Sequence, residues 1–445
     1  MSRYRSACRD TFRKQVTDFV ALLAKNTYSL ANGLRIVHLC QESEVVYCGY
    51  AIKAGTRNEA LGEEGLAHFC EHLAFKGTTR LSPIQIINSI ERYGGELNAY
   101  TAKEETIYHA AILRDYFMKA VDTLTDIVFN STYPQAEIDK ECEVVCEEID
   151  CYRDNPAELI YDDFESRIFC NHALGHNVLG TKETVRSFTS ADCLRFTRRW
   201  YTPDNAVFYV FGDINLPKLV KRLEQLLAGN KPSEPTILPV TDTPDISPNN
   251  VNLSDNGLIT LTDNYIRDNT QQTHQSHVMH GLAFTRNLRY WRIPLFLLNN
   301  MLGGYSMNSL FNISLREKRG LVYTVESTMA TYNDATVWSV YYGCAERDVA
   351  KCSKLIFSQL QRLQQRPLSN TVLNNAKRQL KGQIALSHQQ KENFAIDMAK
   401  QYLHKGTLHD SSRLYSKIDE VTPQTICLLT ENILSKENLF TLVYS

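Results

Sequence analysis

The sequence lacks any apolar run long enough to cross a membrane as a helix, because none of its hydrophobic stretches approaches about 18 residues. The longest apolar-rich stretch, "WRIPLFLLNNML", is interrupted by Asn299 and Asn300 and is typical of a buried helix. The chain also lacks a large charge of either sign, since 48 basic and 50 acidic side chains give a net charge of −2. We therefore expect no membrane span, and no basic field that would attract nucleic acid.

Signals for disulfides and for secretion are missing as well. The twelve cysteines follow neither metal-binding nor disulfide spacing, and no apolar core of about 7–15 residues stands near Met1. These absences predict reduced thiols and a cytoplasmic location. The start "MSRYRSACRDTFRKQ" keeps a second interpretation open, because transit peptides are also rich in arginine and poor in acid. The segment is then either a surface helix or extension, or a signal for the mitochondrial matrix.

The composition that is present is that of a globular protein, with 43% hydrophobic and 22% charged residues over 445 positions. This length suits two or three domains. Residues 229–256 differ from the rest, because five of the 13 prolines fall there together with Asn, Ser and Asp. Such a composition is typical of a linker. It predicts an N-terminal domain at 1–228 and a C-terminal domain at 257–445.

Strand and helix patterns recur in the same order on both sides of this predicted linker. The segments "TIYHAAILRDYFMKAVDTLTDIV" and "TVWSVYYGCAERDVAKCSKLIFSQL" both indicate a strand, an Arg-Asp pair and an amphipathic helix. The periodicity also predicts one long helical run from about 135 to 167. Taken together, these patterns predict an α+β fold with two similar domains that arose by duplication.

Residues 68–72, "HFCEH", place two histidines and a glutamate on one face of an expected helix, because positions i, i+3 and i+4 lie together. His68 and His72 could bind one metal ion, and Glu71 would lie beside it. The pattern HxxEH is the inverted form of the HExxH zinc motif. Cys70 points away from this face and is expected to pack in the interior. The alternative is a helix with two ordinary histidines and a solvated glutamate.

A catalytic zinc ion that keeps one position for water needs a third protein ligand. The segment "DKECEVVCEEID" offers carboxylates on an expected helix, and its cysteines fit an apolar stripe rather than a set of ligands. Glu141 and Glu148 lie seven residues apart and share one helix face. From the residues alone the choice stays open, because a solvated face would hold the same glutamates, Glu141, Glu143, Glu147 and Glu148.

Several segments resemble the M16 family of metallopeptidases, the group of mitochondrial processing peptidase, pitrilysin and insulysin. "GLAHFCEHLAFKGT" resembles the zinc helix of this family, "GGELNAYTAKEETIY" its substrate edge strand, "VVCEEID" the segment of its third ligand and "MLGGYSMNSLF" its glycine-rich loop. The resemblance spans roughly residues 27–445, and the length is that of the half-length, bacterial-type members. It implies two homologous domains, each a mostly antiparallel β-sheet packed with α-helices.

The resemblance also implies roles for individual residues. Glu148, which follows His72 by 76 positions, matches the third metal ligand of the family. Glu141 matches a second glutamate on the same helix that supports the site without being a main ligand. Arg316 and Tyr323, in "LREKRGLVYTVES", match the pair with which catalytic members grip the substrate from the C-terminal half.

The activity implied is that of a zinc-dependent endopeptidase with one Zn²⁺ per chain, held by His68, His72 and Glu148. A water in the fourth zinc position would be activated, and Glu71 would accept its proton as general base. Arg316 and Tyr323 are candidates for stabilising the developing oxyanion and are therefore expected site residues too.

Peptide substrates are expected to bind by strand addition along "ELNAYT", with Asn98 and Ala99 contacting the substrate backbone. Such binding favours unstructured peptides, and Glu105 is expected to orient neighbouring groups. The resemblance further implies two such chains that close around a chamber, with Arg316 and Tyr323 facing the zinc of the partner chain. A homodimer is the simplest assembly, because one sequence carries both parts. The alternatives are a heterodimer with a related chain, a presequence-processing subunit of the mitochondrial type, and a non-catalytic scaffold member of the same fold.

Overall fold

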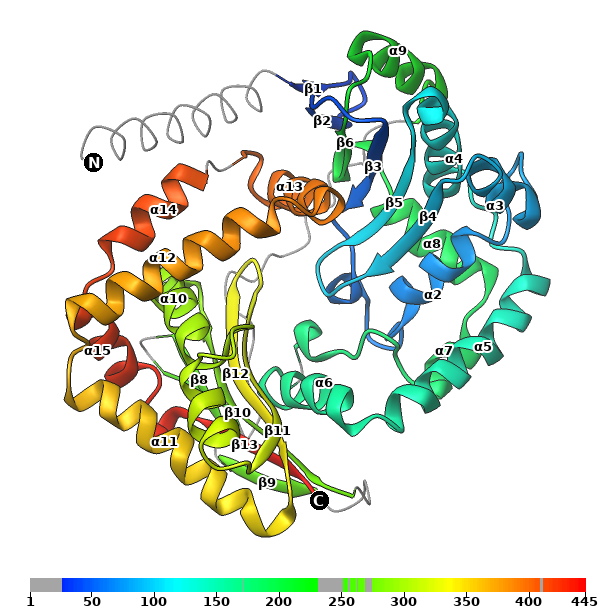
Figure 1. The fold of residues 1–445 in the computed structure, drawn as a ribbon. Helices are drawn as coiled ribbons and strands as arrows, with labels where there is room; N and C mark the ends of the chain where they lie inside the picture. Colours follow the sequence, from blue (N-terminus) through cyan, green and yellow to red (C-terminus); the bar gives the residue numbers. More distant parts are fainter. Residues whose placement is uncertain are drawn as a thin grey trace, which may run out of the picture. The chain divides into compact units, whose positions relative to one another are not determined.

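The described residues form two compact units, each with its own β-sheet (Figure 1). The structure is a computed structural model that describes residues 26–170, 172–230, 251–254, 257–261, 263–268, 274–408 and 411–445. The first unit takes its described residues from Met1–Ile149, His176–Leu238 and Ala385–Leu414, and the second takes them from Asp150–Gly175, Pro239–Ile384 and Tyr415–Ser445. The predicted α+β fold with two similar domains is confirmed.

A six-stranded sheet forms the centre of the first unit, in the order β1-β2-β6-β3-β5-β4. Only β2 and β6 pair in parallel, and the other neighbours are antiparallel, as expected for this fold. The strands are β1 (Thr27–Ser29), β2 (Arg35–Leu39), β3 (Val45–Ile52), β4 (Glu96–Thr101), β5 (Thr106–Leu113) and β6 (Ala206–Phe211). Strand β4 lies at the edge of the sheet, so one side of its backbone has no neighbouring strand within the sheet.

Helices cover both faces of this sheet. Successive side chains of a strand point to opposite faces, and in β3 Tyr50 packs on Phe129 at 5.3 Å while Ala51 packs against Ala395 and Ala399. The helices that lie wholly or mainly in this unit are α2 (Leu66–Ala74), α3 (Pro83–Glu91), α4 (Phe117–Phe129), α5 (Gln135–Arg153), α7 (Lys182–Ser187), α8 (Ser190–Trp200), α9 (Leu216–Leu226) and α13 (Lys391–Lys405).

The second unit is built around a seven-stranded sheet with the main order β11-β12-β10-β13-β9. Its strands are β7 (Val251–Leu253), β8 (Leu258–Leu261), β9 (Tyr265–Asp268), β10 (Ser276–Thr285), β11 (Val322–Thr331), β12 (Ala335–Cys344) and β13 (Phe440–Tyr444). Its helices are α6 (Pro156–Ile168), α10 (Arg292–Gly303), α11 (Val349–Gln365), α12 (Asn370–Ser387), α14 (Ser411–Glu420) and α15 (Pro423–Asn432), with a π-helical turn η6 (Asn312–Glu317).

The predicted repeat of strand, Arg-Asp pair and helix is confirmed in both units. In the first unit β5 leads through the short turn Arg114–Tyr116 into α4, and in the second β12 leads through Glu346–Asp348 into α11. The remaining short helical turns are Thr56–Asn58, Ala173–Gly175, Pro203–Asn205, Arg286–Trp291 and Lys436–Asn438.

The single helical run expected from about 135 to 167 is wrong, because the structure has two helices there. Helix α5 ends at Arg153, and Asn155 leaves the helical conformation before Pro156 starts α6. The residue before a proline is driven away from helical geometry, which explains the break. The break matters for packing, since the end of α5 marks the passage of the chain from the first unit to the second.

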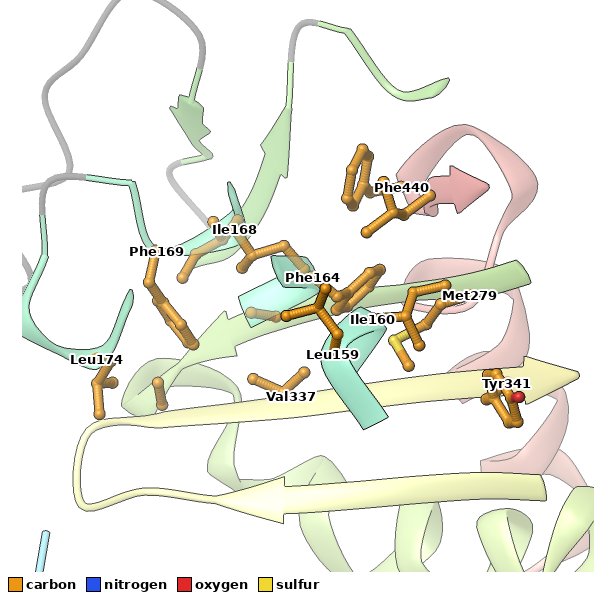
Figure 2. Close-up of a cluster of buried hydrophobic side chains, with 14 of the residues drawn as sticks. Leu159, Ile160, Phe164, Ile168, Phe169, Leu174, Met279, Val337, Tyr341 and Phe440 are labelled. Carbon is orange, nitrogen blue, oxygen red and sulfur yellow. The ribbon is translucent and has the colours of Figure 1, made fainter. Parts of the chain in front are cut away.

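Helix α6 supplies much of the core of the second unit (Figure 2). Its side chains Ile160, Phe164 and Ile168 point toward Met279 and Phe440 of the sheet, and all five are at most 2% exposed. Helix α13 is the opposite case: it comes from the C-terminal half of the sequence but packs on β3 and β6 of the first unit. Neither unit is therefore one continuous stretch of sequence.

Two predictions concern segments that lie wholly or mostly outside the described residues. The arginine-rich start of the chain lies outside the described residues, and so does most of the predicted linker at 229–256, so the boundary at that point stays a prediction. Within the described ranges, no helix combines the length and the apolar character that a membrane crossing requires.

Candidate metal site

Helix α2 carries the HxxEH motif, and its start is fixed by a side chain from outside the helix. The residue before it, Gly65, has a φ of +94°, which glycine adopts without strain, and offers no side chain as a cap. Instead the buried carboxylate of Glu59 accepts hydrogen bonds from the N–H groups of Gly65 at 3.1 Å and Ala67 at 2.8 Å. Sequence reasoning missed Glu59, because a carboxylate so far upstream belongs to no capping pattern.

The structure brings together three of the predicted site residues: His68 and His72 on α2, and Glu148 on α5. One ligand atom from each lies within 4.8 Å of the others. The Oε2 atom of Glu148 is 3.9 Å from Nε2 of His68 and 3.6 Å from Nε2 of His72. Ligands of a tetrahedral zinc ion, each about 2.0–2.2 Å from the metal, lie about 3.3 Å apart. The donor set and its spacing therefore fit one zinc ion.

The pKa values of the two histidines are shifted in opposite directions. Burial, helped by the neighbouring His72, lowers the pKa of His68 to about 3, so His68 is neutral and can offer a lone pair to a metal. For His72, burial opposes the charged form, but the hydrogen bond to Glu141 and the nearby carboxylates outweigh it and raise the pKa. The Nδ1 atom of His68 is buried and has no hydrogen-bond partner among the described residues.

Glu71 lies on the same face of α2 and is buried beside the histidines, with 7% of its surface exposed. Burial is the main cause that raises its pKa to about 7, against the opposing effects of His72 and Thr101. The hydroxyl of Thr101, on β4, donates to Oε2 of Glu71 at 3.3 Å. A carboxylate with a pKa near neutrality, held by one donor on one oxygen, is suited to accept a proton on the other.

The carboxylate of Glu141 contacts His72 at Nδ1, the ring nitrogen that does not face Glu148. Its Oε1 atom is 3.0 Å from Nδ1 of His72, and its Oε2 atom is 2.6 Å from Nζ of Lys76. If Nδ1 carries the proton and donates it to the carboxylate, the Nε2 lone pair is left on the side of Glu148. Burial alone would raise the pKa of Glu141, but the bonds to His72 and Lys76 outweigh it and lower the pKa. Lys76 is a second residue that the sequence reasoning missed.

The predicted substrate strand β4 has an outward-facing backbone at Ala99. At the turn, the N–H of Ala102 donates to the carbonyl of Glu105 at 2.8 Å, so this pair is hydrogen-bonded. Bonded and non-bonded pairs alternate along an antiparallel ladder, so Ala99, opposite Tyr108, has its N–H and C=O directed away from β5. That N–H donates to the side-chain oxygen of the exposed Asn98 at 2.8 Å.

Arg316 and Tyr323 lie together in the second unit, on the π-helical turn η6 and on β11. The guanidinium of Arg316 is 5.8 Å from the centre of the Tyr323 ring, and it lies 3.9 Å from the carboxylate of Glu317. Tyr323 is 83% exposed. Both side chains are therefore accessible to solvent in the described chain, and neither is part of the buried core.

Two further predictions concern residues near the motif. Cys70 is fully buried, and its thiol lies 3.9 Å from the carbonyl of Cys193 on α8, which confirms the expected packing role. Glu105 binds the side chains of His404 at 2.8 Å and Lys400 at 2.7 Å, both on α13. Glu105 therefore joins the β4–β5 hairpin to α13.

The chain matches two family models and several relatives over most of its length. The matching family models are Insulinase (Peptidase family M16), over residues 36–182, and Peptidase M16 inactive domain, over residues 187–380. The chain is 30% identical over 419 residues to the uncharacterized zinc protease YmxG of Bacillus subtilis. This alignment covers 94% of this chain and 97% of that protein. An uncharacterized zinc protease of Streptomyces coelicolor is 30% identical over 410 residues, covering 92% of this chain and 87% of that one.

A solved structure shares the same fold. The crystal structure of a protease from Helicobacter pylori matches with a TM-score of 0.83 at 21% identity, covering 94% of this chain and 99% of that one. At this level of identity the likeness concerns the fold alone.

Proposed function

Because this chain belongs to the M16 family of peptidases, the insulinase family, we propose that it is a zinc-dependent endopeptidase that cleaves unstructured peptides. One observation carries the proposal: His68, His72 and Glu148 offer ligand atoms within 4.8 Å of one another, beside the buried carboxylate of Glu71. A structural histidine pair would not need this third carboxylate, and a plain metal-storage site would not need Glu71.

The proposed resident metal is one Zn²⁺ per chain, held by His68, His72 and Glu148. When bound, zinc supplies Lewis-acid chemistry, because it lowers the pKa of a coordinated water toward about 7 and polarises a carbonyl group. Glu141 keeps His72 in the orientation and tautomer that ligation requires.

Glu71 is the proposed general base. Its pKa of about 7 means that both protonation states are populated near neutral pH, as a group needs that accepts and later returns a proton. Thr101 holds Oε2, so Oε1 is left to take the proton of the attacking water. The same carboxyl would then deliver this proton to the amine that leaves.

The substrate is proposed to add as a strand to β4. The outward N–H and C=O of Ala99 would pair with the peptide backbone, and the amide of Asn98 would release the Ala99 N–H and contact the peptide instead. Strand addition recognises an extended main chain rather than a particular sequence. We therefore expect a preference for peptides without stable structure.

Arg316 and Tyr323 are proposed to act on substrate bound to a second copy of the chain, as donors toward the oxyanion. Their exposure supports this role. A homodimer is the simplest assembly, because one sequence holds the zinc residues and the pair. Mixing Glu71→Gln protein with Tyr323→Phe protein tests this, since each is expected to be nearly inactive alone and the mixture should regain activity. A mixture as inactive as its components would argue against shared sites.

The main test is cleavage of a quenched, unstructured peptide of about 20 residues by the purified chain, with and without a zinc chelator. A matched peptide closed by a disulfide into a rigid loop serves as control. We expect chelator-sensitive cleavage of the open peptide and slow cleavage of the closed one. No cleavage by a zinc-loaded chain would favour a non-catalytic scaffold, or a subunit that needs a related partner.

The location of the protein is also a proposal. All described cysteines are free thiols, which supports a reducing compartment such as the cytoplasm.

A further inference from the structure

Three side chains follow one another along the same side of α2 and its C-terminal extension. His68 and His72 are one turn apart in the helix, and Lys76 follows after one more turn, where its N–H still donates to the carbonyl of Leu73 at 3.0 Å. We call His68, His72 and Lys76 the α2 ladder. Its last member is a cation at the C-terminal end of a helix, where the helix dipole favours positive charge.

Helix α5 faces this ladder with two glutamates that are two turns apart. Glu148 lies opposite His68 and His72, at 3.9 and 3.6 Å. Glu141 lies opposite His72 and Lys76, at 3.0 and 2.6 Å. The helices therefore run in opposite directions along the ladder, and His72 is the residue that both glutamates approach. A shift of α5 along α2 would break all of these contacts together.

The shorter of the two contacts of Glu141 is the one with Lys76. The side chain of Glu141 is only 8% exposed, and burial of a carboxylate is unfavourable unless it is paired. Its two oxygens are divided between the partners, Oε1 toward His72 and Oε2 toward Lys76. Without Lys76, the carboxylate would be free to turn, and its second oxygen would lose its only counter-charge among the described contacts.

We propose that Lys76 is a positioning residue for the metal: by pairing with Glu141 it fixes the carboxylate that orients His72 and keeps Glu148 opposite the two histidines. The inference rests on the proposed zinc site. It adds Lys76, which is neither a metal ligand nor a direct partner of one, because it contacts Glu141 and not His72. Groups that orient a metal ligand typically change metal affinity by about 10–100-fold when they are removed. An ordinary exposed ion pair has no such effect.

The experiment measures zinc affinity on the purified full-length chain by competition with a chromogenic chelator, without any peptide. Lys76→Met removes the charge and keeps most of the stem, and Lys76→Arg keeps a cation. The matched control is Lys140→Met, because Lys140 makes an equally short ion pair, 2.6 Å, with Glu137 on the exposed side of α5. We expect about tenfold weaker zinc binding for Lys76→Met. Lys76→Arg should recover most of the affinity, and Lys140→Met should match the wild type.

A double variant shows whether Lys76 acts through Glu141. In a Glu141→Gln background, Lys76→Met should weaken zinc binding no further, because the interaction that it removes is already gone. This arm also remains informative if Lys76→Met alone folds poorly, since the double variant no longer contains an unpaired buried carboxylate. Circular dichroism of each zinc-free variant checks that it is folded.

The outcomes separate this inference from the proposed function. A folded Lys76→Met chain that binds zinc as tightly as the wild type would overturn the role of Lys76 and leave the zinc site intact. An equal loss on the wild-type and Glu141→Gln backgrounds would overturn the route through Glu141. A wild-type chain that binds no zinc would overturn the proposed function itself, and this inference with it.

Discussion

The two units place a helix against an edge hairpin in the same way, but the polar groups of these helices are satisfied differently. In the second unit α10 packs on β11, and the side-chain oxygen of Asn299 accepts hydrogen bonds from Trp338 at 3.1 Å and from Ser327. In the first unit α2 packs on β4, and the Nε2 atoms of its two histidines face Glu148 at distances too long for hydrogen bonds. The polar side chain of α10 is thus hydrogen-bonded within its unit, whereas the two Nε2 atoms of α2 make no hydrogen bond to Glu148.

The groups around the two helices also differ in charge. Around α2, the carboxylates of Glu71, Glu141 and Glu148 lie close together, and within the described residues Lys76 pairs with Glu141. At Asn299 the buried groups are neutral. Glu71 and Glu141 are buried, and burial of a carboxylate is costly without a counter-charge. The proposed divalent cation would supply positive charge beside them. A polar residue on the helix beside the edge strand is therefore structural where the protein supplies its hydrogen-bond partners, as at Asn299.

The largest expected effect comes from neutralising Glu71, the proposed general base in the first unit. Glu71→Gln keeps the shape of the side chain but cannot accept a proton. We expect a loss of about 10³-fold in kcat/KM on the unstructured peptide, within the usual range for a general base. Zinc content, measured by atomic emission, should stay at the wild-type level. Wild-type activity in a zinc-loaded Glu71→Gln chain would contradict the assignment.

Burial of Glu71 should also be visible in the stability of the zinc-free chain. Its pKa is raised from 4.5 to about 7, so its contribution is fully present below pH 4.5 and is lost as the pH rises through 7. The difference corresponds to roughly 3 kcal/mol of unfolding free energy. Urea unfolding at pH 5 and at pH 8 should therefore show a smaller change for Glu71→Gln than for the wild type. An identical pH dependence would mean that the carboxyl is not buried as described.

In the second unit, Asn299→Ala should cost stability without affecting the metal. The buried donors of Trp338 and Ser327 would lose their acceptor, which costs about 1–3 kcal/mol. Denaturant unfolding measures this loss, and zinc affinity should not change. Asn374→Ala, on the exposed side of α12, is the matched control and should be neutral within about 0.5 kcal/mol. A large drop in zinc affinity in Asn299→Ala would remove the contrast between the units.

The smallest expected effect concerns Thr101. Thr101→Val removes the hydroxyl that holds Glu71 and keeps the volume, while Thr101→Ser keeps the hydroxyl. We expect kcat to fall about fivefold to tenfold in the valine variant, the size of one ordinary hydrogen bond. KM should stay nearly constant, and serine should restore most of the rate. A change in KM alone would assign Thr101 to peptide binding instead.

Much of this could be predicted from the sequence, because the signals are local. The spacing of His68, Glu71 and His72 puts them on one side of a helix whatever the rest of the chain does, and alternation in "ELNAYT" and "TIYHAAIL" predicts paired strands. The choice of Glu148 was not local, since the residues alone left four glutamates open. It came from the family resemblance, and the structure then put Glu148 beside the histidines.

The features that could not be predicted depend on packing between distant segments. Glu59 caps α2 only because the loop before the helix folds back on it. Lys76 belongs to the site only because α5 brings Glu141 to it. The exchange of α6 and α13 between the units has no sequence signal, because an amphipathic helix fits any apolar sheet face. The break at Pro156 did have a signal, and the longer periodic pattern concealed it.

The most direct test of the central claim is a zinc titration of the metal-stripped chain, followed by cleavage of the unstructured peptide. We expect no cleavage by the stripped chain and a cleavage rate that rises linearly with added zinc and levels off at one zinc ion per chain. The same titration of Glu148→Gln should need far more zinc to reach any activity. Full cleavage by the stripped chain, or no cleavage after one zinc ion is bound, would contradict the claim that His68, His72 and Glu148 form the working centre.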